Sequence, residues 1–259
     1  MMNLNYWLVL KNQRQAAEIS IGLKAYLIYL YRFFLPAIHD SEKVLEVGSG
    51  AGTSIAFLES PKILRTDILN SDDPRILGNV DITSLPFASS EFDSVIGMDV
   101  IHHLQYPFLG LIELERVLND ESKSGIIVLI EPYVSIFSYL PYRLLHSEQT
   151  SLFKKRKLVE PLVGSSPEDG DQTLPRLIFC SKEGKRRLNE IFPSDRYLVS
   201  IRYVSIVGFF ITGGINRPLP TPVFVINTLI RVENSLPQFI LKILGSRMII
   251  TIRRLTFPQ

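Results

Sequence analysis

Apolar side chains first recur with a clear spacing between residues 15 and 38, at intervals of three and four positions. This spacing is typical of one face of a helix. Pro36 is expected to end that helix, because proline lacks an amide hydrogen and its ring collides with the preceding turn. A helical region is therefore predicted for residues 1–39. Its apolar positions are Ala16, Ile19, Leu23, Tyr26, Leu27 and Leu30.

From residue 43 onward, short apolar runs alternate with amphipathic segments. Fully apolar strands are typical of a sheet that is covered on both faces. Strands that alternate with helices favour a mostly parallel sheet with helices on each side. We therefore predict an α/β core over residues 40–132. Its strands are expected at 43–47, 63–67, 92–98 and 125–130, and its helices at 51–58 and 108–118.

The regular alternation stops after Glu131. Residues 133–180 contain several prolines and a polar run, and they are expected to form loops, short helices and a lid. Two late strands are expected at 197–207 and 246–255. The apolar segment between these strands has the spacing of helices.

The overall composition limits the classes of protein that need to be considered. The chain has 259 residues, which suits one sizeable α/β domain. With 46% hydrophobic and 21% charged residues, it can form a packed core and is not globally disordered. The formal net charge of +2 is too small to indicate a nucleic-acid partner.

The single cysteine and the first residues of the chain bear on the cellular compartment of the protein. One cysteine, Cys180, excludes an internal disulfide and a cysteine-based zinc cluster, and it fits a reducing compartment. The first residues lack the basic and apolar segments of a secretory signal. The longest charge-free stretch, Tyr203–Asn216, is shorter than the roughly 20 apolar residues that a membrane-spanning helix needs. A cytoplasmic location is therefore expected.

The strongest chemical signal is a glycine-rich turn. The strand at 43–47 carries Glu46 and leads into Gly48-Ser49-Gly50-Ala51-Gly52. Glycines let the backbone approach a ligand closely and adopt angles that other residues resist. Asp67 ends the next strand, at the distance along the chain where an acid binds the ribose diol in nucleotide-binding βαβ units. The pair indicates a nucleotide-type site.

Further motifs follow at close range. They are Asp81-Ile82, Leu85-Pro86-Phe87, the run from Phe92 to Leu104, and the helix end Glu115–Leu118. Together with the glycine turn, this set resembles the class I S-adenosylmethionine-dependent methyltransferase superfamily, specifically its small-molecule branch, called type 11 or UbiE-like. The likeness covers about residues 40–132. The set is specific, although each piece alone is not.

The resemblance implies a doubly wound, Rossmann-like α/β sandwich with a mostly parallel sheet, an antiparallel last strand and a C-terminal helical insertion. It implies S-adenosylmethionine as the cofactor, and methyl transfer to oxygen, nitrogen or carbon of a small or lipid-linked acceptor. The expected parts of this single domain are a helical region at 1–39, a cofactor-binding core at 40–132, a lid and acceptor insertion at 133–195, and late strands with an apolar helical insertion at 196–259.

The resemblance also assigns cofactor-binding roles. The backbone of Gly48, Ser49, Gly50 and Gly52 would cradle the methionine part, and Glu46 would lie beneath the turn near the methionine amino group.

The adenosine part would meet the acids that follow the turn. Asp67 would accept hydrogen bonds from the ribose hydroxyls, with Ile68 beside it, and Asp81 would meet the adenine amino group with Ile82 against the ring. The residues expected beside the methionine and the sulfonium are Met98 and Asp99.

Two alternatives to this interpretation stay open. A nicotinamide or flavin dinucleotide site requires Gly-x-Gly-x-x-Gly, whereas here the third glycine is Gly52 and Thr53 takes the sixth position. The other alternative is a cofactor-binding scaffold without activity. The sequence also departs from the family at Glu46, where aspartate is usual, and at residues 119–125, where only Gly125 remains of a glycine pair.

Candidates for catalysis follow the strand at 92–98. Histidine accepts protons near neutral pH, so His102 and His103 are candidates for a general base, the alternative being that they orient a loop. No metal is expected, because His146 and Glu148 lack a tight ligand motif. The candidates for acceptor binding are Glu131, Tyr133 and His146.

Two features suggest an amphipathic acceptor. Residues 154–157 form a basic run, and residues 203–244 are rich in apolar side chains. Basic runs near apolar surface are typical of contact with anionic lipids. A lipid-linked acceptor and peripheral membrane contact are therefore hypotheses, while the oligomeric state is left open.

Overall fold

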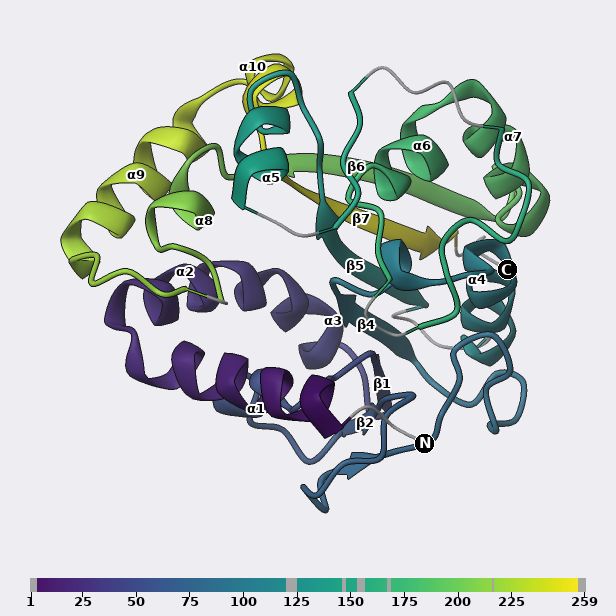
Figure 1. Cartoon of the computed structure of the whole chain (residues 1–259). Coiled ribbons are helices and arrows are strands. Elements are labelled where there is room, and N and C mark those ends of the chain that lie inside the picture. Colours follow the sequence, from purple (N-terminus) through teal and green to yellow (C-terminus); the bar gives the residue numbers. More distant parts are fainter. Residues whose placement is uncertain are drawn as a thin grey trace.

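A single sheet lies at the centre of the molecule (Figure 1). The computed structural model describes residues 4–119, 125–145, 148–152, 157–166, 169–215 and 217–255. Within these residues, seven strands pair in the order β3-β2-β1-β4-β5-β7-β6. The strands are β1 (Val44–Val47), β2 (Ile63–Thr66), β3 (Ile76–Leu77), β4 (Ser94–Met98), β5 (Ile126–Pro132), β6 (Tyr197–Val204) and β7 (Arg247–Arg254).

The strand directions bring the ends of β1, β4 and β5 to one edge. Strands β1 to β5 run parallel, whereas β7 is antiparallel to both β5 and β6. The prediction of a mostly parallel sheet with an antiparallel last strand is therefore confirmed. The two-residue strand β3 was not predicted, because so short a run leaves no periodic signal.

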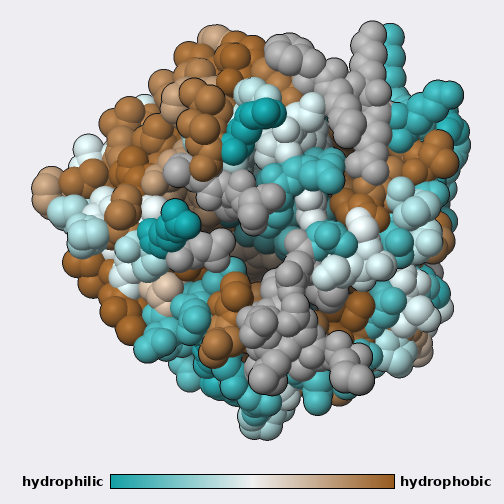
Figure 2. All heavy atoms as spheres, viewed as in Figure 1, coloured by the Kyte–Doolittle hydropathy of each residue, from teal (hydrophilic) through white to brown (hydrophobic). Residues whose placement is uncertain are grey.

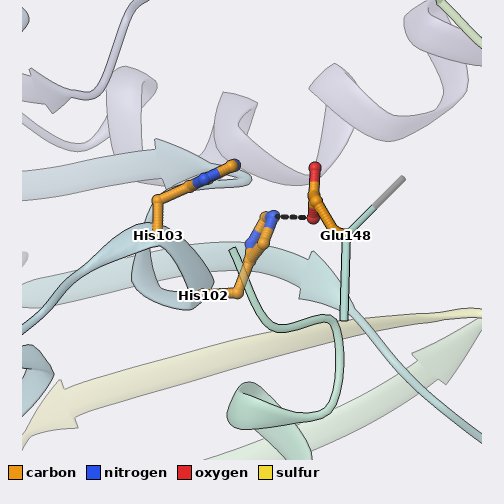
Figure 3. Close-up of side chains that lie close together, drawn as sticks. All are labelled: His102, His103 and Glu148. Atoms are coloured by element: carbon orange, nitrogen blue, oxygen red, sulfur yellow. Dashed lines mark ion pairs between the residues drawn. The ribbon is translucent and has the colours of Figure 1, made fainter. Parts of the chain in front are cut away.

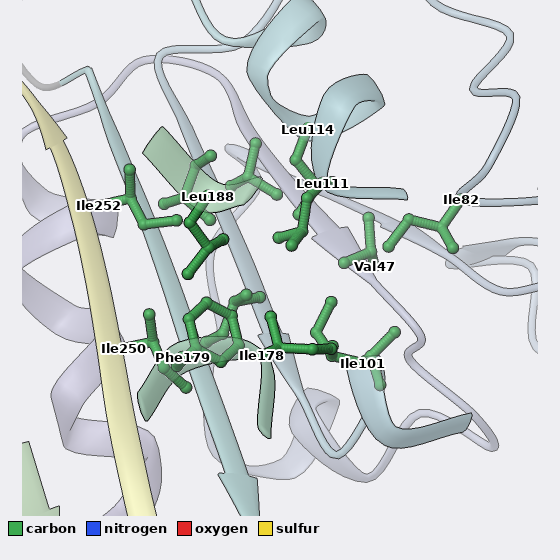
Figure 4. Packing of buried hydrophobic residues seen from close by; sticks show 14 of the residues in the cluster. Val47, Ile82, Ile101, Leu111, Leu114, Ile178, Phe179, Leu188, Ile250 and Ile252 are labelled. Carbon is green, nitrogen blue, oxygen red and sulfur yellow. The ribbon is translucent and has the colours of Figure 1, made fainter. Parts of the chain in front are cut away.

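Helices cover both faces of the sheet, as the doubly wound prediction requires. Val95 and Ile127 belong to a hydrophobic cluster with α4, α6 and α7, whereas Ile96 and Val128 belong to a second cluster with α2, α3 and α9. Figure 4 shows how the first cluster packs between the strands and the helices α4, α6 and α7. The helices are α2 (Ile21–Tyr31), α3 (Leu35–His39), α4 (Pro107–Val117), α6 (Leu174–Cys180), α7 (Lys182–Ile191) and α9 (Val223–Ser235).

The N-terminal region is helical, as predicted, but it is divided into several helices. Helix α1 spans Leu4–Ile19, and a short 3-10 helix, η1 (Arg32–Phe34), joins α2 to α3. The expectation that Pro36 ends the helix is wrong. Pro36 lies in the first turn of α3, where a missing amide hydrogen costs no hydrogen bond.

The α2–α3 region is also the candidate for a membrane span. Among the described helices, the stretch Ile21–His39 is long and apolar enough to cross a membrane, with a hydropathy of 1.3. However, 56% of an 18-residue stretch within it is buried inside the protein. Its side chains, among them Tyr26 and Leu30, pack in the second hydrophobic cluster, as expected for a core helix.

The helix expected at 51–58 is wrong. The structure has only one 3-10 turn there, η2 (Thr53–Ala56), which starts after Gly52 in a left-handed conformation with φ of 81°. The Ser54 hydroxyl then donates to Glu46 at 2.9 Å. This side-chain contact fixes the turn against β1, and the chain reaches Pro61 soon afterwards.

The C-terminal half adds helices that the sequence pattern described only in part. The segments expected to be helical between the late strands are α9 and α10, which bury Ile226, Ile230 and Leu241. Helix α7 was not predicted, and the Ser181 hydroxyl caps it by accepting from the Gly184 amide. The remaining helices here are α5 (Tyr139–Leu145), α8 (Gly208–Ile211) and α10 (Gln238–Leu244).

Candidate functional site

The glycine turn follows β1 at the carboxyl edge of the sheet. Gly48, Gly50 and Gly52 have φ of 66°, 54° and 81°, angles that favour glycine. A Cβ on Gly48 would lie 2.4 Å from Val100 Cγ2, whereas a Cβ on Gly50 would meet nothing within 4 Å. The turn therefore packs tightly on one side and is open at Gly50, where a ligand can approach the backbone.

Asp67 faces this turn from the end of β2. Its carboxylate accepts the Gly50 amide at 2.7 Å and the Leu69 amide at 2.8 Å. Burial raises the pKa of Asp67, although both amide bonds oppose that rise. The next residue, Ile68, is 53% exposed and is free to lie against a flat ligand. The structure thus brings Asp67 and the glycine turn together, as expected for an adenosine-type ligand.

Glu46 lies beneath the turn and is already engaged. Its carboxylate accepts the Ser54 hydroxyl and lies 3.2 Å from the Arg65 guanidinium. Burial raises the pKa of Glu46, and the Ser54 and Arg65 contacts counteract this. Glu46 therefore holds the turn in place. Arg65, which the sequence pattern did not single out, provides its charge partner.

Asp81 and Ile82 lie on the loop that follows β3. Asp81 is exposed and accepts both the amide and the hydroxyl of Thr83 at 2.8 Å, which fixes a local turn. Ile82 is only 7% exposed and belongs to the core beside α4. Asp81 is therefore accessible to a ligand, whereas most of the Ile82 side chain is used in packing.

Met98 and Asp99 end β4 at the same edge. Asp99 has a positive φ of 58°, and its carboxylate accepts a hydrogen bond from the Arg247 guanidinium. Arg247 is buried at the start of β7 and lies 4.9 Å from the Phe209 ring centroid. Arg247 was missed in the sequence, because a charged residue at the start of an apolar strand gives no signal of its partner.

His102 is held between the carboxylates of Glu131 and Glu148, and Figure 3 shows the contact with Glu148. It lies in η3 (Ile101–His103), where Nδ1 is 2.8 Å from Glu131 and Nε2 is 3.5 Å from Glu148. Burial alone would lower the pKa of His102, but hydrogen bonds and charge from Glu131 and Glu148 raise it to about 10. His102 therefore carries the proton that a general base has to lack.

His103 differs from its neighbour. Its Nδ1 lies 3.0 Å from the Asp169 carbonyl, and a carbonyl only accepts, so Nδ1 carries the proton. Burial lowers the pKa of His103, and the charge on His102 lowers it further. The ring is therefore neutral near pH 7 with a lone pair on Nε2, and a role as base stays a prediction for His103 alone.

The acceptor-binding candidates occupy different places. Glu131 is completely buried, and its second oxygen accepts the Val100 and Ile101 amides at 2.9 and 2.8 Å. Tyr133 lies in the core with its hydroxyl bound to the Lys242 carbonyl. Neither side chain is open to an acceptor, so Glu131 is a positioning residue and Tyr133 a packing residue. His146 lies outside the described residues.

Helix α1 forms a further wall of the site that the sequence did not indicate. Arg14 donates to the Ala51 carbonyl at 3.0 Å and to Asp73 at 2.9 Å. Leu10 packs against Ala51 and Leu69. A cavity of about 640 Å³ lies between α1, the glycine turn and residues 71–75.

The local structure argues against a dinucleotide. A pyrophosphate is bound at the free N-terminus of a helix. After Gly52 the chain forms only the four-residue 3-10 helix η2, whose first amides have no α-helix behind them. The glycine turn therefore lacks the anion site that the nicotinamide or flavin alternative requires, whereas S-adenosylmethionine has no phosphate.

Comparisons with known proteins agree with this geometry. Residues 45–126 match the family model described as a methyltransferase domain. None of the curated proteins is detectably similar. The fold is similar to an S-adenosylmethionine-dependent methyltransferase from Archaeoglobus fulgidus, with a TM-score of 0.51, 16% identity, and 89% of this chain and 93% of that chain covered.

A second solved structure to which the chain is similar is phosphoethanolamine N-methyltransferase 2 from Haemonchus contortus. The TM-score is 0.43 at 10% identity, covering 94% of this chain and 60% of that chain. The match at residues 45–126 thus identifies a methyltransferase domain, whose cofactor is S-adenosylmethionine, and the solved structure from Archaeoglobus fulgidus shows the same fold.

Proposed function

We propose that this protein transfers a methyl group from S-adenosylmethionine to an amphipathic or lipid-linked acceptor at a membrane surface, and that it belongs to the UbiE-like branch. The cofactor would supply an activated methyl group on a sulfonium. Gly50, Asp67 and Asp81 would hold it, because Gly50 offers an open backbone, Asp67 lies against the turn and Asp81 is an exposed acceptor. Methyl transfer then depends mainly on positioning of the acceptor.

The observation that carries the choice of acceptor is an exposed apolar surface over α5, α9 and α10. Figure 2 shows this apolar area at the upper left, beside a hollow near the middle of the same face. Large side chains protrude there: Phe224 is 71% exposed, Phe239 67% and Leu144 71%. Contiguous exposed apolar patches mark partner, membrane or ligand contacts.

Basic side chains accompany this surface. Arg143 lies on α5 beside Leu144, Arg231 on α9, and Lys242 on α10 next to Ile243, which is itself 48% exposed. A basic residue near an anionic membrane contributes about 1 kcal/mol of attraction. The combination fits a surface that rests on anionic lipid and receives an acceptor from it.

The cofactor half of the proposal is tested by calorimetric titration of S-adenosylmethionine. Asp67→Ala should weaken binding by roughly 1–3 kcal/mol, the value of a hydrogen bond to a charged group. Asp195→Ala removes an exposed acid outside the described site and should bind as wild type does. Equal binding by Asp67→Ala and the wild type would contradict the assigned ribose contact.

The acceptor half is tested by flotation with phosphatidylglycerol vesicles. The wild type should float with the vesicles, whereas Phe224→Ser combined with Phe239→Ser should remain largely at the bottom. Ile112→Ser is the matched control, because Ile112 is 46% exposed on α4, which lies far from α9 and α10 (Figure 1). Wild-type protein that stays at the bottom would overturn the membrane part of the proposal.

A further inference from the structure

We propose that His102, His103 and Glu148 bind a divalent transition-metal ion of the zinc type. One ligand atom from each of these residues lies within 4.8 Å of the others. The two imidazoles come from η3 after β4, and Glu148 comes from the loop after α5, so the fold brings distant segments together (Figure 3). Two histidines and a carboxylate form a common zinc-binding set.

The outer contacts of both histidines are those of metal ligands. His102 directs Nδ1 to the Glu131 carboxylate, and His103 directs Nδ1 to the Asp169 carbonyl. A histidine that binds a metal usually donates its other ring N–H to a carboxylate or a backbone carbonyl, which fixes the ring and the tautomer. Here both rings have that arrangement, which leaves both Nε2 atoms for a shared ligand.

The spacing between His102 and Glu148 also suits an ion. His102 Nε2 lies 3.5 Å from the Glu148 carboxylate. This separation is long for a hydrogen bond, whose usual length is about 2.9–3.0 Å. Two ligands of a tetrahedral zinc ion, each bound at about 2.1 Å, lie roughly 3.4 Å apart. In the metal-free protein the Nε2 proton takes the place of the ion.

The surroundings of Glu148 supply an independent observation. Gln172 is buried and donates from Nε2 to Glu148, and its Oε1 is a buried atom without a hydrogen-bond partner in the described part of the chain. A water bound to the ion would be a donor for this oxygen. A buried amide oxygen without a donor is costly, so it points to a missing polar group at this place.

Gly170 permits the close approach of the ligands. A Cβ on Gly170 would lie 2.9 Å from the Glu148 carboxylate and 3.1 Å from His103 Cε1. A side chain there would push the two ligands away from their present positions. Because Gly170 does not have a positive φ, the lack of space for a side chain, and not the backbone conformation, explains the glycine.

The expectation of no metal came from the lack of a tight sequence motif, and the proposed ligands indeed come from separate segments. Three protein ligands leave a fourth position open, as in catalytic zinc sites. An acceptor hydroxyl or thiol bound there would lose its proton more readily, a consequence that rests on the proposed function. Metal binding itself does not depend on it.

The test uses the full chain without an affinity tag, first dialysed against a chelator. Zn²⁺ is titrated against a chromophoric chelator, and Co²⁺ is added to a second sample to record visible d–d absorption. The wild type should bind one equivalent and give a tetrahedral cobalt spectrum. His103→Gln and Glu148→Gln should each lower the affinity by at least about 100-fold, and Gly170→Ala by about 10- to 100-fold.

The matched control is His39→Gln, because His39 is an exposed imidazole on α3, away from the cluster. It should bind zinc as the wild type does, and circular dichroism should show every variant folded. Equal affinity in wild type, His103→Gln and Glu148→Gln would overturn the site, as would a cobalt sample without d–d absorption. The S-adenosylmethionine titration on the same samples separates this failure from failure of the proposed function.

Discussion

The two sides of the site are built by different means. On the cofactor side, backbone geometry does most of the work: the left-handed glycines form the turn, and Asp67 receives the Gly50 amide. On the histidine side, buried side chains join separate segments: Glu131 binds His102 and two amides, and Arg247 binds Asp99. The first side is local in sequence, whereas the second depends on tertiary contacts.

The difference has an energetic meaning. A turn made of glycines tolerates changes around it but not an added Cβ at its packed positions. A network of buried charges tolerates little, because removal of one member leaves another unpaired away from water. Substitutions on the histidine side should therefore lower the stability of the whole domain, and those on the cofactor side should act more on binding.

The largest effect is expected for Glu131→Ala. This change leaves the Val100 and Ile101 amides and the His102 ring without their acceptor, all of them buried. The free energy of unfolding should fall by roughly 3–5 kcal/mol, as for other broken buried pairs. Urea unfolding followed by circular dichroism measures it. Glu131→Gln keeps one acceptor oxygen, so its free energy of unfolding should fall by less. An equal fall in both variants would mean that the charge of Glu131 does not contribute to stability.

A smaller effect is expected in the glycine turn, where two glycines can be compared. Gly48→Ala and Gly50→Ala both place a side chain at positive φ, but only the first meets a neighbour, Val100. Gly48→Ala should therefore lower the free energy of unfolding by about 1–3 kcal/mol more than Gly50→Ala.

Cofactor binding should show the reverse order. Among protein molecules that are folded, Gly50→Ala should weaken binding more than Gly48→Ala. Gly50 faces open space, so a methyl group there should weaken S-adenosylmethionine binding by roughly tenfold, or about 1.4 kcal/mol, in a folded protein. Thermal unfolding with and without cofactor measures both quantities. A Gly50→Ala protein that binds as tightly as wild type would place the cofactor elsewhere.

The smallest effect concerns pH. Hydrogen bonds from Arg116 lower the pKa of Glu113, which also accepts the Leu85 amide and so holds the loop at 85–87. A lowered carboxyl pKa stabilises the fold above the unfolded pKa of about 4.3, and the contribution is lost as the pH falls through the folded pKa. Because the pair is partly exposed, the contribution is at most about 1 kcal/mol.

This prediction is checked by the difference in unfolding free energy between wild type and Glu113→Gln. The difference should be present at pH 7 and shrink as the pH is lowered below about 4.3. Glu42→Gln is the control, because Glu42 is a carboxylate on the surface with 91% of its side chain exposed. A difference that does not change with pH would mean that Glu113 acts by packing alone.

The sequence predicted the sheet well because its strands are short apolar runs that stand out from the segments between them. The runs at 43–47, 63–67 and 125–130 all became strands, and the helix at 108–118 became α4. The local helix at 51–58 was wrong because a side-chain contact, Ser54 to Glu46, and a left-handed glycine override helical propensity. Periodicity carries no information on either.

The site was predictable to the extent that it is local. Gly50 and Asp67 lie close together in sequence and in space, so their spacing was informative. Arg247 and Glu148 were not assigned, because their partners are distant along the chain and only the folded sheet brings them near. His102 was assigned a base role that Glu131 and Glu148 do not favour, and the sequence did not show that these carboxylates lie beside it.

The contact between Arg14 and the glycine turn has a consequence for the mobility of the two loops that it joins. The Ala51 carbonyl and Asp73 belong to the loops after β1 and β2, yet both depend on a guanidinium from the first helix. A protein shortened at its N-terminus to exclude Arg14 would keep every strand of the sheet. It would lose one wall of the cofactor turn. The loops after β1 and β2 would then move independently of each other, and their amide hydrogens would exchange faster.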